Sequence, residues 1–222
     1  ANSISTYDGY TAEFMSQDLS AWCGPDFAGK YPGDYLHKTF KPSLPIFHLC
    51  GGLDKLTEDE ITPEDPDDGL PVSLDQWIAR DGIRCFKVKL RGNDNDWDVQ
   101  RTADIASVIK QTYDKLGITD RFYLSTDSNE MNPNPESVVE YLERLRELSP
   151  LAYDALLYLE QPTERDLTQS RFDMSGVSAL KPVVVDEGVT SVEMMDLAIE
   201  LGWSGVGLKT CKGHSSAMLY VA

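Results

Sequence analysis

Charged residues end five short apolar stretches of this chain, and this recurring pattern constrains the fold more than any other feature. The stretches run over residues 86–89, 122–127, 156–160, 183–187 and 206–209. Apolar runs of this length are typical of strands buried in a parallel sheet. In α/β proteins, ligands bind at the carboxyl ends of such strands. The charged residues therefore predict a functional site at one edge of a sheet.

The spacing of these charges indicates one repeating strand-helix unit. Intervals of 38, 33, 26 and 23 residues separate Lys89, Asp127, Glu160, Asp186 and Lys209. A (β/α)8 barrel needs about 30 residues for each strand and helix, so every interval has room for one crossover helix. The pattern predicts an α/β fold of the (β/α)8-barrel type with the five charges on one rim. The sequence contains at most six strands, fewer than a closed barrel has, so we expect the chain to be an excerpt of a longer protein.

Apolar periodicity and capping residues predict where the elements lie. We expect strands at residues 55–57, 84–90, 121–127, 156–160, 182–186 and 205–209, the first of them weak. Helices are expected at residues 11–22, 73–80 and 98–116, after the Asn134-Pro135 cap and after Thr190. Residues 62–71, with three prolines and four acids, predict a solvated loop.

Composition and charge narrow the classes of partner. The chain has 222 residues, and its 41% hydrophobic content fits one globular domain and excludes a disordered or fibrous chain. A formal net charge of -17 would repel nucleic acid and anionic membranes, so we expect a small-molecule ligand instead. The four cysteines form no CxxC pair, and no apolar run approaches the ~20 residues of a membrane helix. These observations favour a reduced, cytoplasmic protein.

Three carboxylates, Asp127, Glu160 and Asp186, stand at successive strand ends. Gathered at one rim, they would repel one another and raise their own pKa values unless a cation shares the site. Oxygen ligands suit a hard dication, and Mg²⁺ binds through a few carboxylates together with water and substrate oxygens. Each carboxylate taken alone is better explained as a surface or helix-capping residue, but the three together favour a magnesium site.

The lysines predict acid-base chemistry beside that metal. Lys87 and Lys89 lie two residues apart on one strand, so both side chains point into the same end of the barrel. Two ammonium groups crowded beside a dication would have lowered pKa values, as a general base requires. Lys209 ends a strand across the barrel, which would give a substrate one lysine on each face. The alternative for Lys87 and Lys89 is protection of a strand edge.

Several short motifs resemble those of the enolase superfamily, in its muconate-lactonizing-enzyme-like branch (the mandelate racemase/muconate lactonizing enzyme family). Each motif is weak alone, but five in order with this spacing are specific. A further match to the family is the Leu49-Cys50-Gly51-Gly52 segment that leads into the barrel. The five motifs are Lys87-Val88-Lys89, Asp127-Ser128-Asn129, Glu160-Gln161-Pro162, Asp186-Glu187 and Lys209-Thr210-Cys211-Lys212.

The resemblance implies a modified (β/α)7β barrel and an α+β capping domain. Residues 1–52 would be the end of the capping domain with the segment that leads into the barrel, and residues 53–222 an incomplete catalytic barrel. Members of this family are commonly octamers or dimers, so the resemblance also implies a homo-oligomer. One departure is Gly213-His214, where the family usually has two glycines. His214 is interpreted as a loop residue, and His37 and His48, ahead of the barrel, as structural.

The resemblance also implies roles for the site residues. Asp127, Glu160 and Asp186 would bind one Mg²⁺, for which Mn²⁺ can substitute. Lys89 and Lys209 would act as acid and base on opposite faces of a small carboxylate substrate, with Lys87 tuning Lys89 and holding the carboxylate. The second shell would include Asn129, Glu187 and Lys212. The implied reaction is removal of the α-proton through an ene-diolate, which leads to racemisation or epimerisation, cycloisomerisation or dehydration by an isomerase or lyase.

Two other functions remain open from the sequence. One is a non-catalytic metal-binding barrel, or a family member that has lost its activity and has a structural or regulatory role. The other is a metal-dependent or lysine aldolase, in which Lys209 would act on a carbonyl substrate. Solvent-deuterium exchange separates the enolase-type reaction from the first, and borohydride trapping of a Schiff base at Lys209 separates it from the lysine aldolase.

Overall fold

A computed structural model describes residues 3–37, 39 and 41–209 of the chain. It divides into two compact units, each described here by itself. The barrel unit comprises Pro45–Gly188 and Leu197–Gly207. The smaller unit comprises the described parts of residues 1–44, 189–196 and 208–222. The division at residues 52 and 53 between a capping domain and a barrel stays a prediction.

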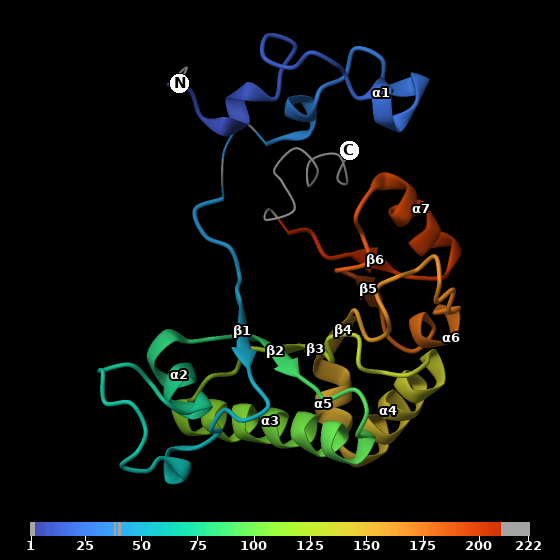
Figure 1. Ribbon diagram of the computed structural model, residues 1–222. Helices are drawn as coiled ribbons and strands as arrows, with labels where there is room; N and C mark the ends of the chain where they lie inside the picture. Colours follow the sequence, from blue (N-terminus) through green and yellow to red (C-terminus); the bar gives the residue numbers. More distant parts are fainter. Residues whose placement is uncertain (1–2, 38, 40, 210–222) are drawn as a thin grey trace. The chain divides into compact units, whose positions relative to one another are not determined.

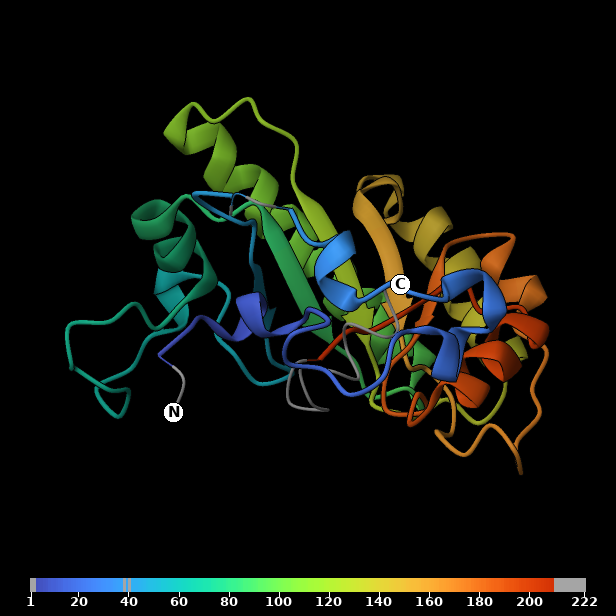
Figure 2. The ribbon, with the colours of Figure 1, turned by 90° about the horizontal axis from the view of Figure 1, so that it is seen from above.

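Six parallel strands form the sheet of the barrel unit, and they neighbour one another in chain order. Figure 2 shows the green and yellow strands side by side. Consecutive parallel strands joined by helices are the repeating unit of a barrel, so the predicted α/β barrel class is confirmed. The strands are β1 (Phe47–Cys50), β2 (Cys85–Lys89), β3 (Tyr123–Asp127), β4 (Leu156–Glu160), β5 (Val183–Val185) and β6 (Gly205–Val206).

Helices cover one face of this sheet. Figure 1 shows α2 (Leu74–Asp81), α3 (Asn95–Leu116), α4 (Pro135–Leu148) and α5 (Pro150–Ala155) together on one side of the strands. They are followed by the short α6 (Ser175–Ser178) and by α7 (Val192–Glu200). The apolar sides of α3 and α4 are fully buried, with Ile105, Ile109, Leu142 and Leu145 at 0% exposure. Each such side chain contributes about 1.5–3 kcal/mol through burial, which fixes the strand ends against a rigid layer.

Two of the capping residues read from the sequence, Ser73 and Asn134, begin their helices as predicted. Ser73 and Gln76 form a capping box at the start of α2, and Gly82 ends the helix with a left-handed φ of 61°. The side chain of Asn134 accepts a hydrogen bond from the Ser137 amide (2.9 Å) at the start of α4. The helix predicted at residue 98 begins earlier, because Asp94 caps it through the Trp97 amide.

Some of the elements of the barrel unit differ from the prediction. The first strand is β1 at Phe47–Cys50, whereas Lys55 makes only an isolated bridge to Ser73. The compact apolar segment before Gly51 is therefore a strand of the sheet, and His48 lies within it. The periodicity also missed α5, which Ser149 caps directly after α4 through the Ala152 amide. The strand predicted at 205–209 is only two residues long.

The smaller unit has short helical turns in place of the helix predicted at residues 11–22. The side chain of Asp18 accepts hydrogen bonds from the Ser20 and Gly29 amides (3.1 and 2.7 Å), so the chain turns at this point. The elements are η1 (Thr6–Gly9), α1 (Ser20–Cys23), η2 (Pro25–Phe27) and η3 (Pro32–Tyr35). A fourth such turn, η4 (Glu58–Glu60), belongs to the barrel unit.

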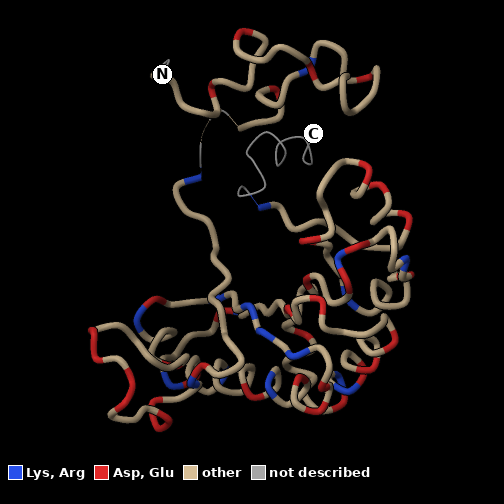
Figure 3. The backbone as a smooth tube through the Cα atoms, viewed as in Figure 1, with Lys and Arg blue, Asp and Glu red and all other residues tan. Residues whose placement is uncertain are grey.

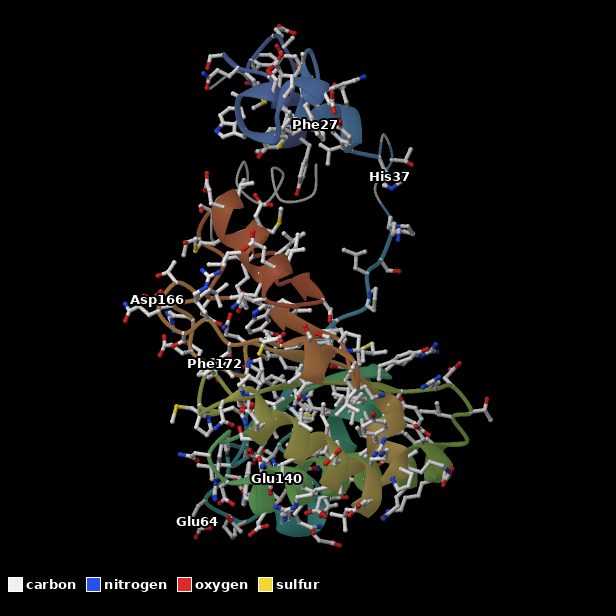
Figure 4. All side chains as sticks on the ribbon, turned by 90° about the vertical axis from the view of Figure 1, so that its right-hand side faces the viewer. Phe27, His37, Glu64, Glu140, Asp166 and Phe172 are labelled. Atoms are coloured by element: carbon white, nitrogen blue, oxygen red, sulfur yellow. The ribbon has the colours of Figure 1, made fainter. Side chains whose placement is uncertain are left out.

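Acidic residues dominate one long loop of the barrel unit, between β1 and α2. Figure 3 shows red segments along it, and in Figure 4 the labelled Glu64 lies at its exposed edge. Lys55 binds Asp65 at the base of the loop, so residues 62–71 form the solvated loop that the sequence predicts. None of the helices in the described ranges has both the length and the apolar character that a membrane crossing needs.

Candidate functional site

The three predicted carboxylates follow neighbouring strands of the sheet. Asp127 ends β3, where it pairs in register with Lys89 of β2 and Glu160 of β4. Asp186 comes directly after β5. Their exposed fractions are 2%, 8% and 0% for Asp127, Glu160 and Asp186, so all three are buried. A Cβ on Gly207 would lie 3.0 Å from Oδ1 of Asp186, and the glycine after β6 therefore leaves room for that carboxylate.

Two lysines of β2 bind these carboxylates. Lys87 Nζ lies 2.9 Å from Asp127 Oδ2 and 2.7 Å from Glu160 Oε1, so its ammonium group bridges two strand ends. Lys89 Nζ binds Asp127 Oδ2 as well and donates to Asn129 Oδ1 at 2.9 Å. The structure thus brings five predicted residues together: two lysines, two carboxylates and one amide. Edge protection does not account for this, because β2 lies inside the sheet between β1 and β3.

The electrostatics differ among these neighbours. Burial raises the pKa of Glu160, and the Asp127 and Asp186 charges add to that effect against the hydrogen bond from Lys87. Burial also favours the neutral form of Asp127, yet hydrogen bonds from Lys89, Lys87 and the Asn129 amide outweigh it and lower its pKa. Burial disfavours the charged form of Lys87, but hydrogen bonds to Glu160 and Asp127 raise its pKa. Two carboxylates therefore hold the proton of this lysine, and the lowered pKa expected beside a dication stays a prediction.

Strained backbone follows the carboxylates. Asn129, Glu130 and Gln161 all have left-handed φ values (49°, 70° and 33°), and each lies within three residues of a site carboxylate. Residues other than glycine in this region cost on the order of 1–3 kcal/mol, and they persist only where the surroundings fix them. Here the Glu130 amide donates to the Gln161 carbonyl (2.9 Å), and the Asn129 amide donates to Asp127 Oδ1 (2.9 Å). The strain is held by contacts within the site.

The buried carboxylate of Asp98 holds the backbone of the loop after Lys89. Both oxygens of Asp98, which is 1% exposed, accept backbone hydrogen bonds, from Arg91 (2.7 Å) and Gly92 (2.8 Å). Gly92 has a φ of 75°, and a Cβ there would lie 2.8 Å from Met131. The loops after β2 and β3 therefore pack too closely to admit a side chain at Gly92.

An ion pair joins the loops after β3 and β4. Arg165 Nε lies 2.7 Å from Glu130 Oε2, and the second guanidinium nitrogen binds the other carboxylate oxygen. Figure 4 labels the neighbouring Asp166 on this loop. Arg165 also lies close enough to Glu187 for that carboxylate to raise its pKa, although Glu130 has the larger effect. The sequence analysis missed Glu130 and Arg165, because a pair 35 residues apart leaves no local pattern.

The donor chemistry of the site fits a hard dication. Asp127, Glu160 and Asp186 offer buried carboxylate oxygens from three adjacent strands, the ligand type that Mg²⁺ prefers. Within the described residues, no three His, Cys, Asp or Glu side chains already stand close enough together to coordinate an ion. Lys87 Nζ instead compensates Asp127 and Glu160. Asp127 and Glu160 thus already accept a cationic partner.

The structure says less about the other residues that the sequence singles out. Lys209 belongs to the smaller unit, so its predicted place opposite Lys89 stays a prediction. Lys212 and His214 lie outside the described residues. His48 packs its ring 5.3 Å from that of Trp77 in α2, which is a structural contact. His37 belongs to the smaller unit.

Comparisons with known proteins identify the fold. No protein-family model and no curated protein matches the chain. A solved structure, the mandelate racemase/muconate lactonizing protein from Herpetosiphon aurantiacus, matches with a TM-score of 0.50 and 22% identity over 66% of this chain and 38% of that one. About two thirds of this chain therefore shares the fold of part of that protein. This confirms at the level of fold the resemblance seen in the sequence motifs.

Two further structures match with lower TM-scores. Muconate cycloisomerase from Pseudomonas fluorescens gives 0.48, with 20% identity over 65% of this chain and 36% of that one. O-succinylbenzoate synthase from Thermosynechococcus elongatus, complexed with Mg in its active site, gives 0.46, with 17% identity over 72% and 41%. The chain thus spans about two fifths or less of the length of these structures.

Proposed function

We propose that this protein belongs to the enolase superfamily and removes the α-proton of a small carboxylate substrate with the help of Mg²⁺. The observation that carries the proposal is the contact of Lys87 and Lys89 with carboxylates at adjacent strand ends. Partly buried ammonium groups beside buried carboxylates, at the carboxyl ends of parallel strands, are suited to proton transfer in a barrel enzyme. The product would be that of a racemase or epimerase, a cycloisomerase or a dehydratase.

Three carboxylates would hold the metal: Asp127, Glu160 and Asp186. When bound, Mg²⁺ polarises a substrate carboxylate and offsets the negative charge that develops on it. Asp127 also has a second role, because it holds the Nζ of Lys89. Asn129 accepts from the same Nζ at 2.9 Å and so restricts the direction in which Lys89 points.

Lys89 is the proposed group that takes or returns the α-proton. Lys87 lies two residues before Lys89 on β2. Its ammonium group would supply positive charge to the substrate carboxylate once that group no longer contacts Asp127 and Glu160. Lys209 is the proposed acid or base for the other face, on the strength of the sequence motif alone. We further propose Glu187 and Lys212 as second-shell residues, and a cytoplasmic homo-oligomer as the working form.

Solvent-deuterium exchange tests this function. The protein is incubated with Mg²⁺ in D2O and a panel of small carboxylic acids, and loss of the α-proton signal is followed by ¹H NMR. Lys89→Ala and Lys209→Ala should each abolish exchange on at least one face of an accepted acid, with a loss of about 10²–10⁴-fold for a missing acid-base group. Lys110→Ala, on the exposed side of α3, is the matched control and should exchange as the wild type does.

Two outcomes count against the proposal. Unchanged exchange in both lysine variants would remove Lys89 and Lys209 from the reaction. Tight Mg²⁺ binding without exchange of any acid in the panel would favour the non-catalytic metal-binding barrel, the second function that the sequence leaves open.

A further inference from the structure

Gln161 is a buried amide between two of the proposed metal ligands. It directly follows Glu160, its side chain is 0% exposed, and its backbone amide donates to the Val184 carbonyl of β5 at 2.9 Å. The mechanism proposed above gives this residue no role. Buried amides need partners for both the oxygen and the nitrogen, so its contacts indicate what the side chain does.

The contacts of the side-chain oxygen lie around Asp186, and the side-chain nitrogen contacts the loop after β4. The side-chain oxygen Oε1 accepts from the backbone amides of Asp186 (2.8 Å) and Gly188 (3.1 Å), and Nε2 donates to the Thr163 carbonyl (3.0 Å). Two backbone donors on one side and a carbonyl acceptor on the other leave only one orientation for the amide, because a flipped group would face N–H with N–H. The side chain of Gln161, at the end of β4, therefore holds the turn that carries Asp186 through two hydrogen bonds.

The backbone at Gln161 and at Gly188 adopts conformations that allow the hydrogen bonds of the Gln161 side chain. Gln161 itself holds a left-handed φ of 33°, and its carbonyl accepts from the Glu130 amide of the loop after β3. A Cβ on Gly188 would lie 2.9 Å from the Arg165 carbonyl and 3.4 Å from Gln161 Oε1, so only glycine allows the turn to approach. Gln161 thus connects the ends of β3, β4 and β5.

We propose that Gln161 is a positioning residue that sets the Asp186 carboxylate against that of Glu160 by holding the Asp186 and Gly188 amides. The expected effect on metal binding rests on the proposed function. The expected effect on the Asp186 and Gly188 amides rests on the hydrogen bonds alone. Groups that orient metal ligands typically contribute 10–100-fold to metal affinity, so the loss of the amide should weaken binding without unfolding the sheet.

The test uses Gln161→Met, which keeps the length of the side chain and removes both hydrogen-bonding groups. Its matched control is Gln169→Met, the same change at an exposed glutamine whose Nε2 donates to Asp166 (2.7 Å). Mn²⁺ binding to the protein is measured by electron paramagnetic resonance, and amide hydrogen exchange by NMR. We expect Gln161→Met to weaken Mn²⁺ binding about 10–100-fold and Gln169→Met to leave it unchanged.

Hydrogen exchange separates positioning from a general loss of stability. In Gln161→Met the Asp186 and Gly188 amides should exchange faster, while the amides of β2 and β3 keep their protection. Gln161→Glu, at a pH that protonates the new carboxyl group, keeps an acceptor for the two amides and a donor for the Thr163 carbonyl. It should therefore keep the protection of both amides, and it decides the matter if Gln161→Met does not fold. Uniform loss of protection across the sheet, or loss in Gln161→Glu, would overturn the proposal.

A double-mutant cycle shows whether Gln161 acts through Asp186. In an Asp186→Ala background, Gln161→Met should have no further effect on Mn²⁺ affinity, whereas an equal effect in both backgrounds would overturn the positioning role. If the wild-type protein binds no Mn²⁺, the proposed function fails. The exchange of the Asp186 and Gly188 amides then still decides whether Gln161 holds this turn.

Discussion

The two ends of the sheet carry ion pairs of opposite character. At the carboxyl ends of the strands, Lys87 is 22% exposed and its partner Asp127 3%. Near the amino ends, the pairs Lys110–Asp114 and Arg84–Asp120 are at least half exposed on both sides. Lys110, Asp114 and Asp120 of these pairs line a groove of ≈ 690 Å³. The same residue types are thus solvated at one end and buried at the other.

This difference teaches that the buried charges are not there for stability alone. Exposed pairs contribute little because water screens them. Buried pairs lose hydration that their attraction only partly restores, and an apolar core of the same shape is often as stable or more so. A chain that keeps four charged side chains at the carboxyl ends of β2, β3 and β4, next to strained backbone, is explained by a site that needs those charges.

The largest effect is expected where a single partner is removed from the buried group. Lys87→Met leaves Asp127 and Glu160 with less compensation, and we expect a loss of about 3 kcal/mol in the free energy of unfolding at pH 7. Urea unfolding measures it. Mg²⁺ added to this variant should restore part of the loss, because a dication bound to the two carboxylates replaces the missing charge.

Lys110→Met is the control for the exposed end, and its unfolding free energy should stay close to that of the wild type. Equal losses in the two variants would show that burial does not separate the two ends. A loss in Lys87→Met that Mg²⁺ leaves untouched would count against Asp127 and Glu160 as metal ligands.

A smaller effect distinguishes the two carboxylates that Lys87 bridges. The folded-state pKa of Asp127 is lowered, so its contribution to stability is present above the unfolded-state pKa and is lost as the pH falls through the folded value. The pKa of Glu160 is raised, so its contribution is present below the unfolded-state pKa and is lost as the pH rises through the folded value. The two carboxylates should therefore respond to pH in opposite directions.

Urea unfolding from pH 7 down to pH 3 tests this with two isosteric variants. The deficit of Asp127→Asn relative to the wild type should shrink toward the acid end, as the wild-type carboxylate becomes protonated. The deficit of Glu160→Gln should grow over the same range. Parallel curves for the two variants would mean that the lysines compensate both carboxylates alike.

The sequence predicted what depends on spacing and failed where the chain folds through distant contacts. Charges at regular intervals placed Lys89, Asp127 and Glu160 at strand ends, because side chains at the carboxyl ends of parallel strands must meet at one edge. The first strand was misplaced because Phe47–Cys50 is made a strand by pairing with β2, 35 or more residues later. The Glu130–Arg165 pair was missed for the same reason. The bridge of Lys87 between two carboxylates follows from the register of the strands, which periodicity does not give.

The smallest effect is expected at the Glu130–Arg165 pair. This pair joins the loops after β3 and β4, at the carboxyl ends of the strands, but the Arg165 side chain is 58% exposed. Arg165→Gln removes a two-point contact to Glu130 that comes from a largely solvated arginine, so the urea midpoint should fall less than in Lys87→Met, where one ammonium group serves two carboxylates. The deficit should also shrink in 1 M NaCl, because the Debye length falls to about 3 Å and salt then screens the interaction between exposed charges over longer distances. A large, salt-insensitive loss would instead place the pair with the buried charges. The group of buried ion pairs would then include the loop after β4 as well as the carboxyl ends of the strands.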